Sequence, residues 1–407
     1  MFMKYRIRAL DIKTREKGLK EFKRIGATPQ GQQIMTGKIL PLALKVRDVD
    51  SKAANILKQE MLSRGGDVVT SRGSLLGTEA KTDVIILGTK KIIKNLAGKI
   101  KMQPFGLKVL SVELNAFIER LENIRKGNFL KISNRKFNLV NEVLVMGILN
   151  VTPDSFYDGG FYYKKDKAFR RIEEIVSEGA HIIDIGGIST RPGSEPVTLD
   201  EEMDRTIPIV KNVVKNYDIL VSIDTYRSEV AERAIDAGAH IVNDISAMTF
   251  DMEMVNVVSK SKVSVIIMHM KGTPKDMQLN PRYKDVIEEI YDFLGDRINV
   301  AIESGIKEDK IIIDPGIGFG KKLEHNLEIL DNLSEFGILG YPVLVGASRK
   351  SFIGKILDLP VEKRLEGSIT AAVCSIVNGA NILRVHDVKE TIRAVKIAKS
   401  IKNIRNV

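Results

Sequence analysis

Polar and charged residues stand at the ends of eight short apolar runs in the second part of the sequence. Any one of these acids or amides alone could be a structural hydrogen-bonding group. Gathered in one cavity, they would be costly to bury without a polar ligand, and a flat ring with several N–H donors and carbonyl or imine acceptors would satisfy them. The residues are Asn150, Asp184, Asp224, Asn243 with Asp244, His269, Asp314, Ser348, Arg349, Lys350, Arg384 and His386.

Cationic residues occupy the loops after three of these runs. Arg191 follows the second run, Lys350 the seventh, and Arg384 and His386 the eighth. The arginine fork matches phosphate oxygens, and lysine supplies a compact charge. We therefore expect a ligand that is amide-like at one end and anionic and phosphorylated at the other.

The apolar runs alternate with amphipathic stretches in a strand-then-helix pattern, which predicts an α/β protein. Near-continuous Val, Ile and Leu runs favour parallel strands that are covered on both faces. Eight such units in about 265 residues match a (β/α)8 TIM barrel, in which functional residues stand at the C-terminal strand ends and phosphates bind after strands 7 and 8. An open doubly wound sheet is the alternative, but no GxGxxG motif opens it. The expected strands are 143–150, 181–187, 219–225, 241–246, 263–270, 311–316, 343–348 and 382–387.

Three joins between a helix and the next strand share one pattern. In each, a Gly-Ala pair is followed by a polar residue, which is His181, His240 or Asn381. A glycine with a left-handed backbone can end the helix so that the strand starts at once. We expect His181 and His240 to be structural residues.

Residues 1–138 are basic, and we expect them to form a small additional N-terminal domain of α/β or α+β type. Residues 1–140 carry 29 Lys and Arg against 12 Asp and Glu, and the whole chain has a net charge of +11. A solvated basic face accounts for this excess, and without an RNA-binding aromatic signature no nucleic-acid partner is expected. The expected strands are 4–10, 40–49, 67–71 and 83–89, the expected helices are 50–66 and 90–100, and residues 126–140 would form a hairpin that plugs the barrel at 139–407.

Composition limits the class of protein. The 407 residues are 43% hydrophobic and 28% charged, which is typical of a globular chain. The single cysteine, Cys374, excludes an internal disulfide and a cysteine zinc site, and it is expected to be inert in the core. We find no apolar run of about 18 residues and no signal peptide, so a cytoplasmic protein without a membrane partner is expected.

Seven motifs resemble those of the dihydropteroate synthase family, whose members have a pterin-binding barrel. They occur in family order from about residue 139 to the end, and residues 1–138 lie outside the resemblance. The motifs are MGILNVTPDSFYDGG (146–160), IIDIGGISTRPGSEPV (182–197), VSIDTYRSEVAERAIDAGAHIVNDIS (221–246), MHMKGTPKDMQ (268–278), IIIDPGIGFGK (311–321), LVGASRKSFIG (344–354) and RVHDV (384–388).

The resemblance implies a transferase of folate biosynthesis that joins 4-aminobenzoate to (7,8-dihydropterin-6-yl)methyl diphosphate and releases diphosphate. It implies that Asp224, Asn243, Asp314 and Lys350 bind the pterin, and that Asn150 binds Mg²⁺ through its amide oxygen. We expect diphosphate to leave before the arylamine attacks, so that no strong general base is needed. The resemblance also implies a homodimer.

The remaining expected site residues bind the diphosphate or border the arylamine. Phe156 and Pro192 would lie on loops that close over the site. Thr190, Arg191, Arg384 and His386 would hold the diphosphate, Asp184 would support this charged mouth, and Phe156, Pro192 and Ser351 would border the arylamine. The expected catalytic residues are Lys350, Arg384, His386 and Asp184.

One departure from the family pattern concerns Ile188, where many members have glutamate. The missing carboxylate could alter how the arylamine is handled. One alternative substrate is therefore a phosphorylated ribosyl-aminobenzene, which the methanopterin pathway couples to the same pterin. A second alternative is a pterin-dependent methyltransferase, although such an enzyme has no use for SRKSF and RVHD as a diphosphate site.

Overall fold

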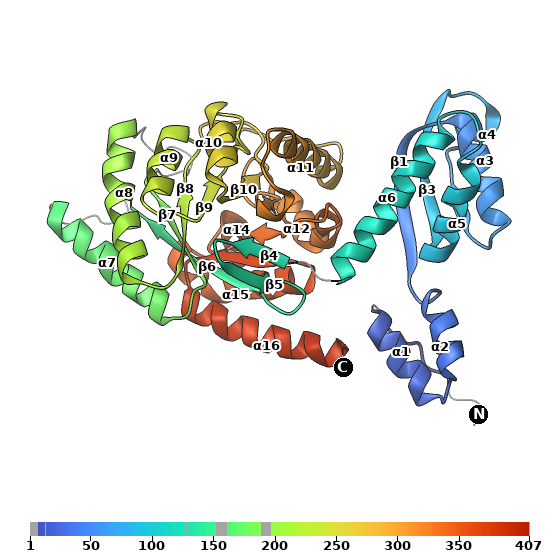
Figure 1. The fold of residues 1–407 in the computed structure, drawn as a ribbon, viewed down its shortest axis with the longest axis horizontal. Helices are drawn as coiled ribbons and strands as arrows, with labels where there is room; N and C mark the ends of the chain where they lie inside the picture. The colour runs from blue at the N-terminus through green and yellow to red at the C-terminus, as the bar shows by residue number, and fades with distance from the viewer. Residues whose placement is uncertain (1–6, 13, 127–128, 152–160, 189–196, 407) are drawn as a thin grey trace. The chain divides into compact units, whose positions relative to one another are not determined.

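The computed structural model describes residues 7–12, 14–126, 129–151, 161–188 and 197–406. Its contacts divide the chain into two units, Met1–Glu122 with Ile401–Val407 and Asn123–Ser400. Figure 1 shows a small sheet with helices in the first unit and a ring of strands with outer helices in the second.

The first unit has a three-stranded antiparallel sheet in the order β1-β3-β2. Its strands are β1 (Pro41–Asp50), β2 (Asp67–Val69) and β3 (Lys81–Thr89). Buried Val68, Val84 and Ile86 on one face of the sheet pack with the helices α3 and α5. The helices of this unit are α1 (Arg15–Arg24), α2 (Pro29–Thr36), α3 (Ser51–Leu62), α4 (Arg72–Leu76), α5 (Lys90–Ile100) and α6 (Leu107–Lys126).

The sequence predicted this unit in part. Three of the four expected strands and both expected helices are present. The strand expected at 4–10 is wrong for residues 7–10, which form no regular element, and residues 4–6 lie outside the described part of the chain. Helices α1, α2, α4 and α6 were not predicted. The hydroxyls of Thr14 and Thr28 accept backbone N–H bonds at the first turns of α1 and α2, which is the action of an N-cap.

The second unit is a (β/α)8 barrel, as predicted. Its eight parallel strands follow the order β11-β10-β9-β8-β7-β6-β13-β12, and a parallel bridge between Ile313 and Val343 joins β11 to the last strand. The strands are β6 (Leu144–Asn150), β7 (Ile182–Gly186), β8 (Leu220–Asp224), β9 (Ile241–Asp244), β10 (Ser264–Met268), β11 (Ile311–Asp314), β12 (Leu344–Val345) and β13 (Ile382–Val385).

Helices follow the strands around the barrel (Figure 1). They are α7 (Phe161–Ser177), α8 (Leu199–Asn216), α9 (Ser228–Asp236), α10 (Glu253–Ser261), α11 (Val286–Glu303), α12 (Leu323–Asp331), α13 (Leu333–Gly337), α14 (Ser351–Leu357), α15 (Leu365–Val377) and α16 (Val388–Asn406). Cys374 is exposed on α15, so its expected place in the core is wrong. The buried face of α15 carries Ala371, Ala372 and Ile376 instead.

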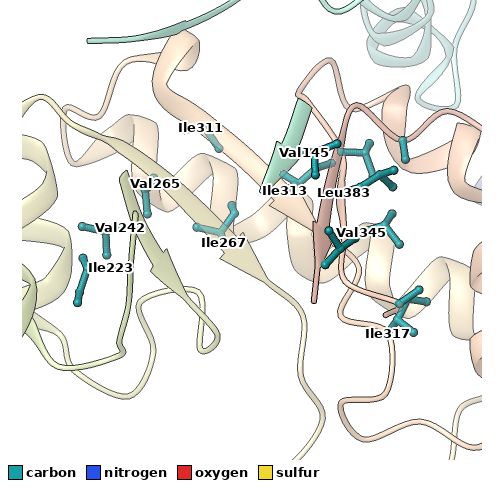
Figure 2. Packing of buried hydrophobic residues seen from close by; sticks show 14 of the residues in the cluster. Val145, Ile223, Val242, Val265, Ile267, Ile311, Ile313, Ile317, Val345 and Leu383 are labelled. Atoms are coloured by element: carbon teal, nitrogen blue, oxygen red, sulfur yellow. The ribbon is translucent and has the colours of Figure 1, made fainter. Parts of the chain in front are cut away.

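The pleat of the strands separates the two faces of the barrel. One set of alternate residues, including Val145, Val242, Val265 and Leu383, packs with the apolar sides of the helices in a single buried cluster (Figure 2). The other set points to the barrel interior, since side chains alternate along a strand. This interior set includes the polar residues at the C-terminal ends of the strands. The same alternation therefore places apolar residues in the core and polar residues in the site.

A hairpin plugs the N-terminal end of the barrel, as predicted. Strands β4 (Phe129–Ile132) and β5 (Arg135–Asn138) are antiparallel. Buried Leu130 and Ile132 pack with the first interior residues of the barrel strands, which include Leu144, Ile182 and Leu220. The contact boundary therefore falls between Glu122 and Asn123, earlier than the expected boundary at residue 138, because the hairpin belongs to the barrel.

At the Gly-Ala joins, the start of each strand is hydrogen-bonded to the adjacent strand of the barrel. The glycines have positive φ, for example 100° at Gly238. His181 Nδ1 accepts the N–H of Val145 at 3.1 Å, and His240 Nδ1 accepts that of Val221 at 3.0 Å. Asn381 Oδ1 accepts the N–H of Val343 at 2.9 Å in the same way. The three side chains thus satisfy backbone donors, and the predicted structural role of the two histidines is confirmed.

Candidate active site

Strand register brings the polar strand ends to one level of the barrel. Asn150 pairs with Gly186, Gly186 with Asp224, and Asp224 with Asn243. On the other side, Asp314 ends β11 opposite Met268. A side chain on Gly186 would come within 3.6 Å of both Asn150 Oδ1 and Asp224 Oδ2, so these two oxygens flank one glycine. The C-terminal ends of the strands therefore form the mouth that the sequence predicted.

Arg384 of β13 joins two carboxylates across this mouth. Its Nε donates to Asp184 Oδ2 at 2.6 Å, and its Nη2 donates to Asp224 Oδ2 at 2.5 Å. The Asp184 side chain is fully buried, whereas 15% of Asp224 and 19% of Arg384 stay exposed. The guanidinium therefore lies at the floor of the mouth between β7 and β8, with its charge balanced by acids from both strands.

Asp184 also binds an amide, and one of its buried oxygens has no hydrogen-bond partner. Asn243 Nδ2 donates to Asp184 Oδ2 at 3.1 Å. Among the described residues, Asp184 Oδ1 and the interior hydroxyls of Ser222 and Ser264 are buried without a hydrogen-bond partner. An unpaired buried acceptor costs free energy, and a donor from a bound ligand would recover it.

Burial shifts the pKa values of the groups at this floor. Desolvation raises the pKa of Asp224 to about 7, with a smaller rise from Asp184 and an opposing effect of Arg384. Burial also raises the pKa of Asp314. Desolvation alone would lower the pKa of Arg384, but Asp184 and Asp224 outweigh it and raise this pKa. The arginine is therefore always charged, while Asp224 titrates near neutral pH.

Lys350 stands at the start of α14 and reaches over the glycine-rich loop that follows β11. Its Nζ donates to the carbonyl of Ile317 at 2.6 Å and lies 4.0 Å from the ring centre of Phe319. Burial lowers its pKa to about 7, and Asp314 opposes this effect. The site thus holds an acid and a base that both titrate near pH 7.

His386 is fixed at the end of β13 by contacts from the loop after β12 and from helix α7. Its backbone N–H donates to Ser348 Oγ at 3.2 Å, and its Nδ1 lies 3.1 Å from the same oxygen. The carbonyl of His386 accepts Arg171 Nη2 of α7 at 2.6 Å. Together these contacts hold the imidazole in the loop after the eighth strand, where the sequence predicted an anion site.

The structure does not bring every predicted residue into the mouth. Asp244 binds its own loop, accepting from the N–H and hydroxyl of Ser246 at 2.7 Å and from the N–H of Met248 at 2.8 Å. Ser351 is exposed next to Lys350 at the first residue of α14. Four predicted residues, Phe156, Thr190, Arg191 and Pro192, lie outside the described residues.

Two buried polar groups near the site were not predicted. The Nζ of buried Lys321 contacts His269 Nδ1 at 2.9 Å and donates to the carbonyl of Phe319 at 2.9 Å. Burial, with a smaller effect of Lys321, lowers the pKa of His269 to about 2, so this imidazole is neutral. The second group centres on Glu202 of α8, which is fully buried.

Glu202 ties α8 to the loop after β8. Its Oε1 accepts from Thr225 Oγ1 at 2.7 Å, and its Oε2 accepts from Arg227 Nη1 at 3.0 Å. Arg227 Nη2 donates to the carbonyl of Val197, which follows the β7–α8 loop. Nothing in the sequence distinguished this glutamate from its neighbours, because α8 begins with several acidic residues that read as a solvated surface.

The described residues offer limited support for a bound cation. No three His, Cys, Asp or Glu side chains in that part of the chain come together as a metal cage. Magnesium usually takes one or two protein oxygens and completes its shell with waters and substrate phosphates. The amide oxygen of Asn150 at the mouth fits such a site, in which a diphosphate would supply further oxygens.

Comparison with known proteins connects this mouth to one family. The model of the pterin binding enzyme family matches residues 146–386. The dihydropteroate synthase of Clostridium beijerinckii is 46% identical over 273 residues, which cover 67% of this chain and 99% of that protein. A Halobacterium salinarum protein named probable bifunctional folylpolyglutamate synthase/dihydropteroate synthase is 36% identical over 395 residues, which cover 96% of this chain and 47% of that protein. This last match therefore includes most of the first unit.

Solved structures give the same result for the barrel. The Yersinia pestis dihydropteroate synthase in a sulfonamide drug complex has a TM-score of 0.65 and 41% identity, over 68% of this chain and 99% of that chain. The Xanthomonas albilineans dihydropteroate synthase with 4-aminobenzoic acid has a TM-score of 0.64 and 38% identity, over 68% and 98% of the two chains.

No helix in the described ranges has both the length and the apolar character needed to cross a membrane.

Proposed function

The chain belongs to the pterin-binding enzyme family and is a transferase with dihydropteroate synthase function, and on that premise we propose how its residues act. The substrates are (7,8-dihydropterin-6-yl)methyl diphosphate and 4-aminobenzoate. The bond between the methylene carbon and the diphosphate oxygen breaks, and a bond from that carbon to the arylamine nitrogen forms. The nitrogen loses one proton, and diphosphate leaves.

Asp224, Asn243, Asp314 and Lys350 bind the pterin edge. The carboxylate of Asp224, which is partly exposed, lies on the interior face where the ring's N–H groups need acceptors. A ring that donates to these oxygens offsets the cost of burying them. Lys350, placed over the glycine-rich loop, contacts the ring from the opposite side of the mouth.

Arg384 and His386 hold the diphosphate, together with Thr190 and Arg191 of the β7–α8 loop. The permanent charge of Arg384 and the fixed imidazole of His386 stand where negative charge grows as the diphosphate departs. Asp184 and Asp224 orient the guanidinium, and their negative charge favours the electron-poor methylene-pterin that remains. The departure of diphosphate therefore comes before the attack by the amine.

Mg²⁺ is the proposed cofactor, bound through the amide oxygen of Asn150. When bound, it neutralises charge on the diphosphate oxygens. Asn150 contributes by holding its oxygen at the level of Asp224, beside Gly186. Substrate and water would supply the other ligands, as Mg²⁺ usually keeps phosphates and waters in its shell.

The arylamine lies at the outer part of the mouth, bordered by Ser351, Phe156 and Pro192. Ser351 supports this assignment because it is exposed and directly follows Lys350. An aniline nitrogen attacks without a strong base, so neutral His269, deep beside Lys321, is not needed as one. A cytoplasmic location and a homodimer stay predictions of the sequence.

The bridge of Arg384 between Asp184 and Asp224, facing Lys350 across one mouth, is the observation that carries this proposal. The test supplies purified protein with the pterin diphosphate, Mg²⁺ and 4-aminobenzoate and measures dihydropteroate and diphosphate. Lys350→Ala and His386→Ala should lose turnover, while Lys355→Ala, an exposed lysine of the same helix, should keep it. Full activity of Lys350→Ala would contradict the proposed roles.

A parallel assay tests the arylamine. Ile188 removes a carboxylate next to Gly187, whose carbonyl Arg205 Nη1 binds at 3.2 Å. If the protein used only the phosphorylated ribosyl-aminobenzene, the proposed substrate would be wrong while the pterin and diphosphate roles would stand. We expect turnover with 4-aminobenzoate, because the described mouth places its cations with the diphosphate.

A further inference from the structure

Strands β12 and β13 are joined by very few backbone pairs. Only Leu344 with Ile382 and Val345 with Leu383 pair between them, because β12 has two residues. Lys350 and His386 follow these two strands. The backbone ladder therefore ends several residues before the two side chains that the proposed function assigns to the pterin and to the diphosphate.

Side chains continue the register where the backbone pairing stops. Each paired residue of β13 lies 38 positions after its partner in β12, and the same separation recurs between Ser348 and His386. It recurs again between Arg349 and Asp387: Arg349 Nε donates to Asp387 Oδ2 at 2.9 Å, and Nη2 donates to Asp387 Oδ1 at 2.6 Å. A two-bond fork of this kind fixes both distance and orientation.

The backbone at Arg349 indicates that its side chain is needed there. Its φ of 56° lies in the left-handed region, which glycine adopts at lower cost than arginine. The surroundings hold this conformation, since the N–H of Arg349 donates to Ser368 Oγ at 2.9 Å and its carbonyl accepts Arg364 Nη1 at 3.1 Å. The guanidinium also donates to the carbonyls of Val361 and Glu362 through Nη1.

We propose that Arg349 and Asp387 are positioning residues that hold Lys350 and His386 at a fixed separation. Each member of the ion pair is the direct chain neighbour of one of the two functional side chains. Breaking the methylene–diphosphate bond requires the pterin contact and the diphosphate contact at once, so their relative placement affects the rate. This inference rests on the proposed function, which assigns these contacts.

The test compares Asp387→Asn with Asp218→Asn in the full chain. Asp218 pairs with Arg135 at the opposite end of the barrel, so its variant also removes one arginine partner and is the matched control. Asp387→Asn should lower kcat about tenfold to a hundredfold, the range that small misplacements of reacting groups produce. It should also weaken binding of inorganic diphosphate measured by calorimetry, with little change in melting temperature. Asp218→Asn should match the unmodified protein in both.

Wild-type kcat and diphosphate affinity in Asp387→Asn would overturn the inference. Arg349→Lys keeps the charge but loses the fork, so it provides the same test should the first variant fold poorly; a wild-type kcat there also overturns the inference. The double variant Arg349→Lys/Asp387→Asn should lose no more activity than the worse of its two single variants, whereas additive losses would count against a joint action. The Lys350→Ala assay tests the proposed function separately. If Asp387→Asn is fully active and Lys350→Ala is inactive, only the positioning role of the clamp, the ion pair of Arg349 and Asp387, is contradicted.

Discussion

The two groups that titrate near pH 7 predict a bell-shaped dependence of kcat/KM on pH. Burial raises the pKa of Asp224 to about 7 and lowers that of Lys350 to about 7. On the proposed assignment, Asp224 must be ionised to accept the pterin N–H, and Lys350 must be protonated to contribute its charge. Acid therefore removes the first requirement and alkali the second, and kcat/KM reports such ionisations of the free enzyme.

The magnitude follows from the two pKa values. With both at about 7, roughly one quarter of the free enzyme carries both required charges at pH 7. That fraction falls about threefold at pH 6 or 8 and about twenty-fivefold at pH 5 or 9. Burial also raises the pKa of Asp314, whose charge opposes the lowering of the Lys350 pKa.

Initial rates at subsaturating pterin diphosphate and saturating 4-aminobenzoate, from pH 5 to 9, measure the profile. Asp224→Asn should have a lower maximal kcat/KM, and its kcat/KM should lack the decrease at acid pH that Asp224 causes. Lys350→Arg should lose the alkaline limb, because arginine keeps its charge throughout this range. A flat profile between pH 6 and 8 in the unmodified enzyme would refute the reasoning, as would an unchanged acid limb in Asp224→Asn.

Three further predictions concern the scaffold. His181→Ala should lower the free energy of unfolding by about 1–3 kcal/mol, because the buried N–H of Val145 loses its acceptor. His181→Asn should cost less, because an amide can accept such a bond, as Asn381 does from the N–H of Val343. Equal losses for the two variants in urea denaturation at pH 7.5 would contradict this. Burial lowers the pKa of His181, so below about pH 6.5 the unfolded chain binds more protons than the folded chain. The free energy of unfolding should therefore decrease as the pH is lowered below that value, and it should decrease less in His181→Asn. Leu130→Ala should cost about 2–5 kcal/mol by leaving a cavity in the plug, measured the same way, and a loss below 1 kcal/mol would show that the hairpin packs loosely. Glu202→Gln should destabilise less than Glu202→Ala in thermal unfolding, since glutamine still fills the buried position.

The barrel and its mouth were predictable because one pattern determines both. Apolar runs that end in a polar residue define strands covered on both faces, and the polar residue then lies at the C-terminal end. Asp224, Asn243 and Asp314 were placed in this way. The contacts of Arg384 with two acids could not be predicted, because the length of an arginine side chain lets it reach several neighbouring strands.

Other features depend on contacts between distant segments, which no local pattern records. Lys321 and Glu202 are charged residues in polar surroundings of the sequence, and only the tertiary structure buries them with partners. Cys374 sits in an apolar stretch but faces outward, because the turn of α15 buries the residues beside it. The clamp between Arg349 and Asp387 likewise appears only once the two strands are aligned.

The hairpin plug at the N-terminal end of the barrel also limits how ligands can enter and leave. Leu130 and Ile132 close that end with almost no exposed surface, so ligands cannot pass through it. On the proposed assignment, the pterin occupies the deep part of this dead-end passage and the arylamine the part nearest the entrance. An arylamine that arrives first would obstruct the pterin, which makes the order of arrival a property of the architecture. A compound that fills the entrance would likewise trap a pterin already inside.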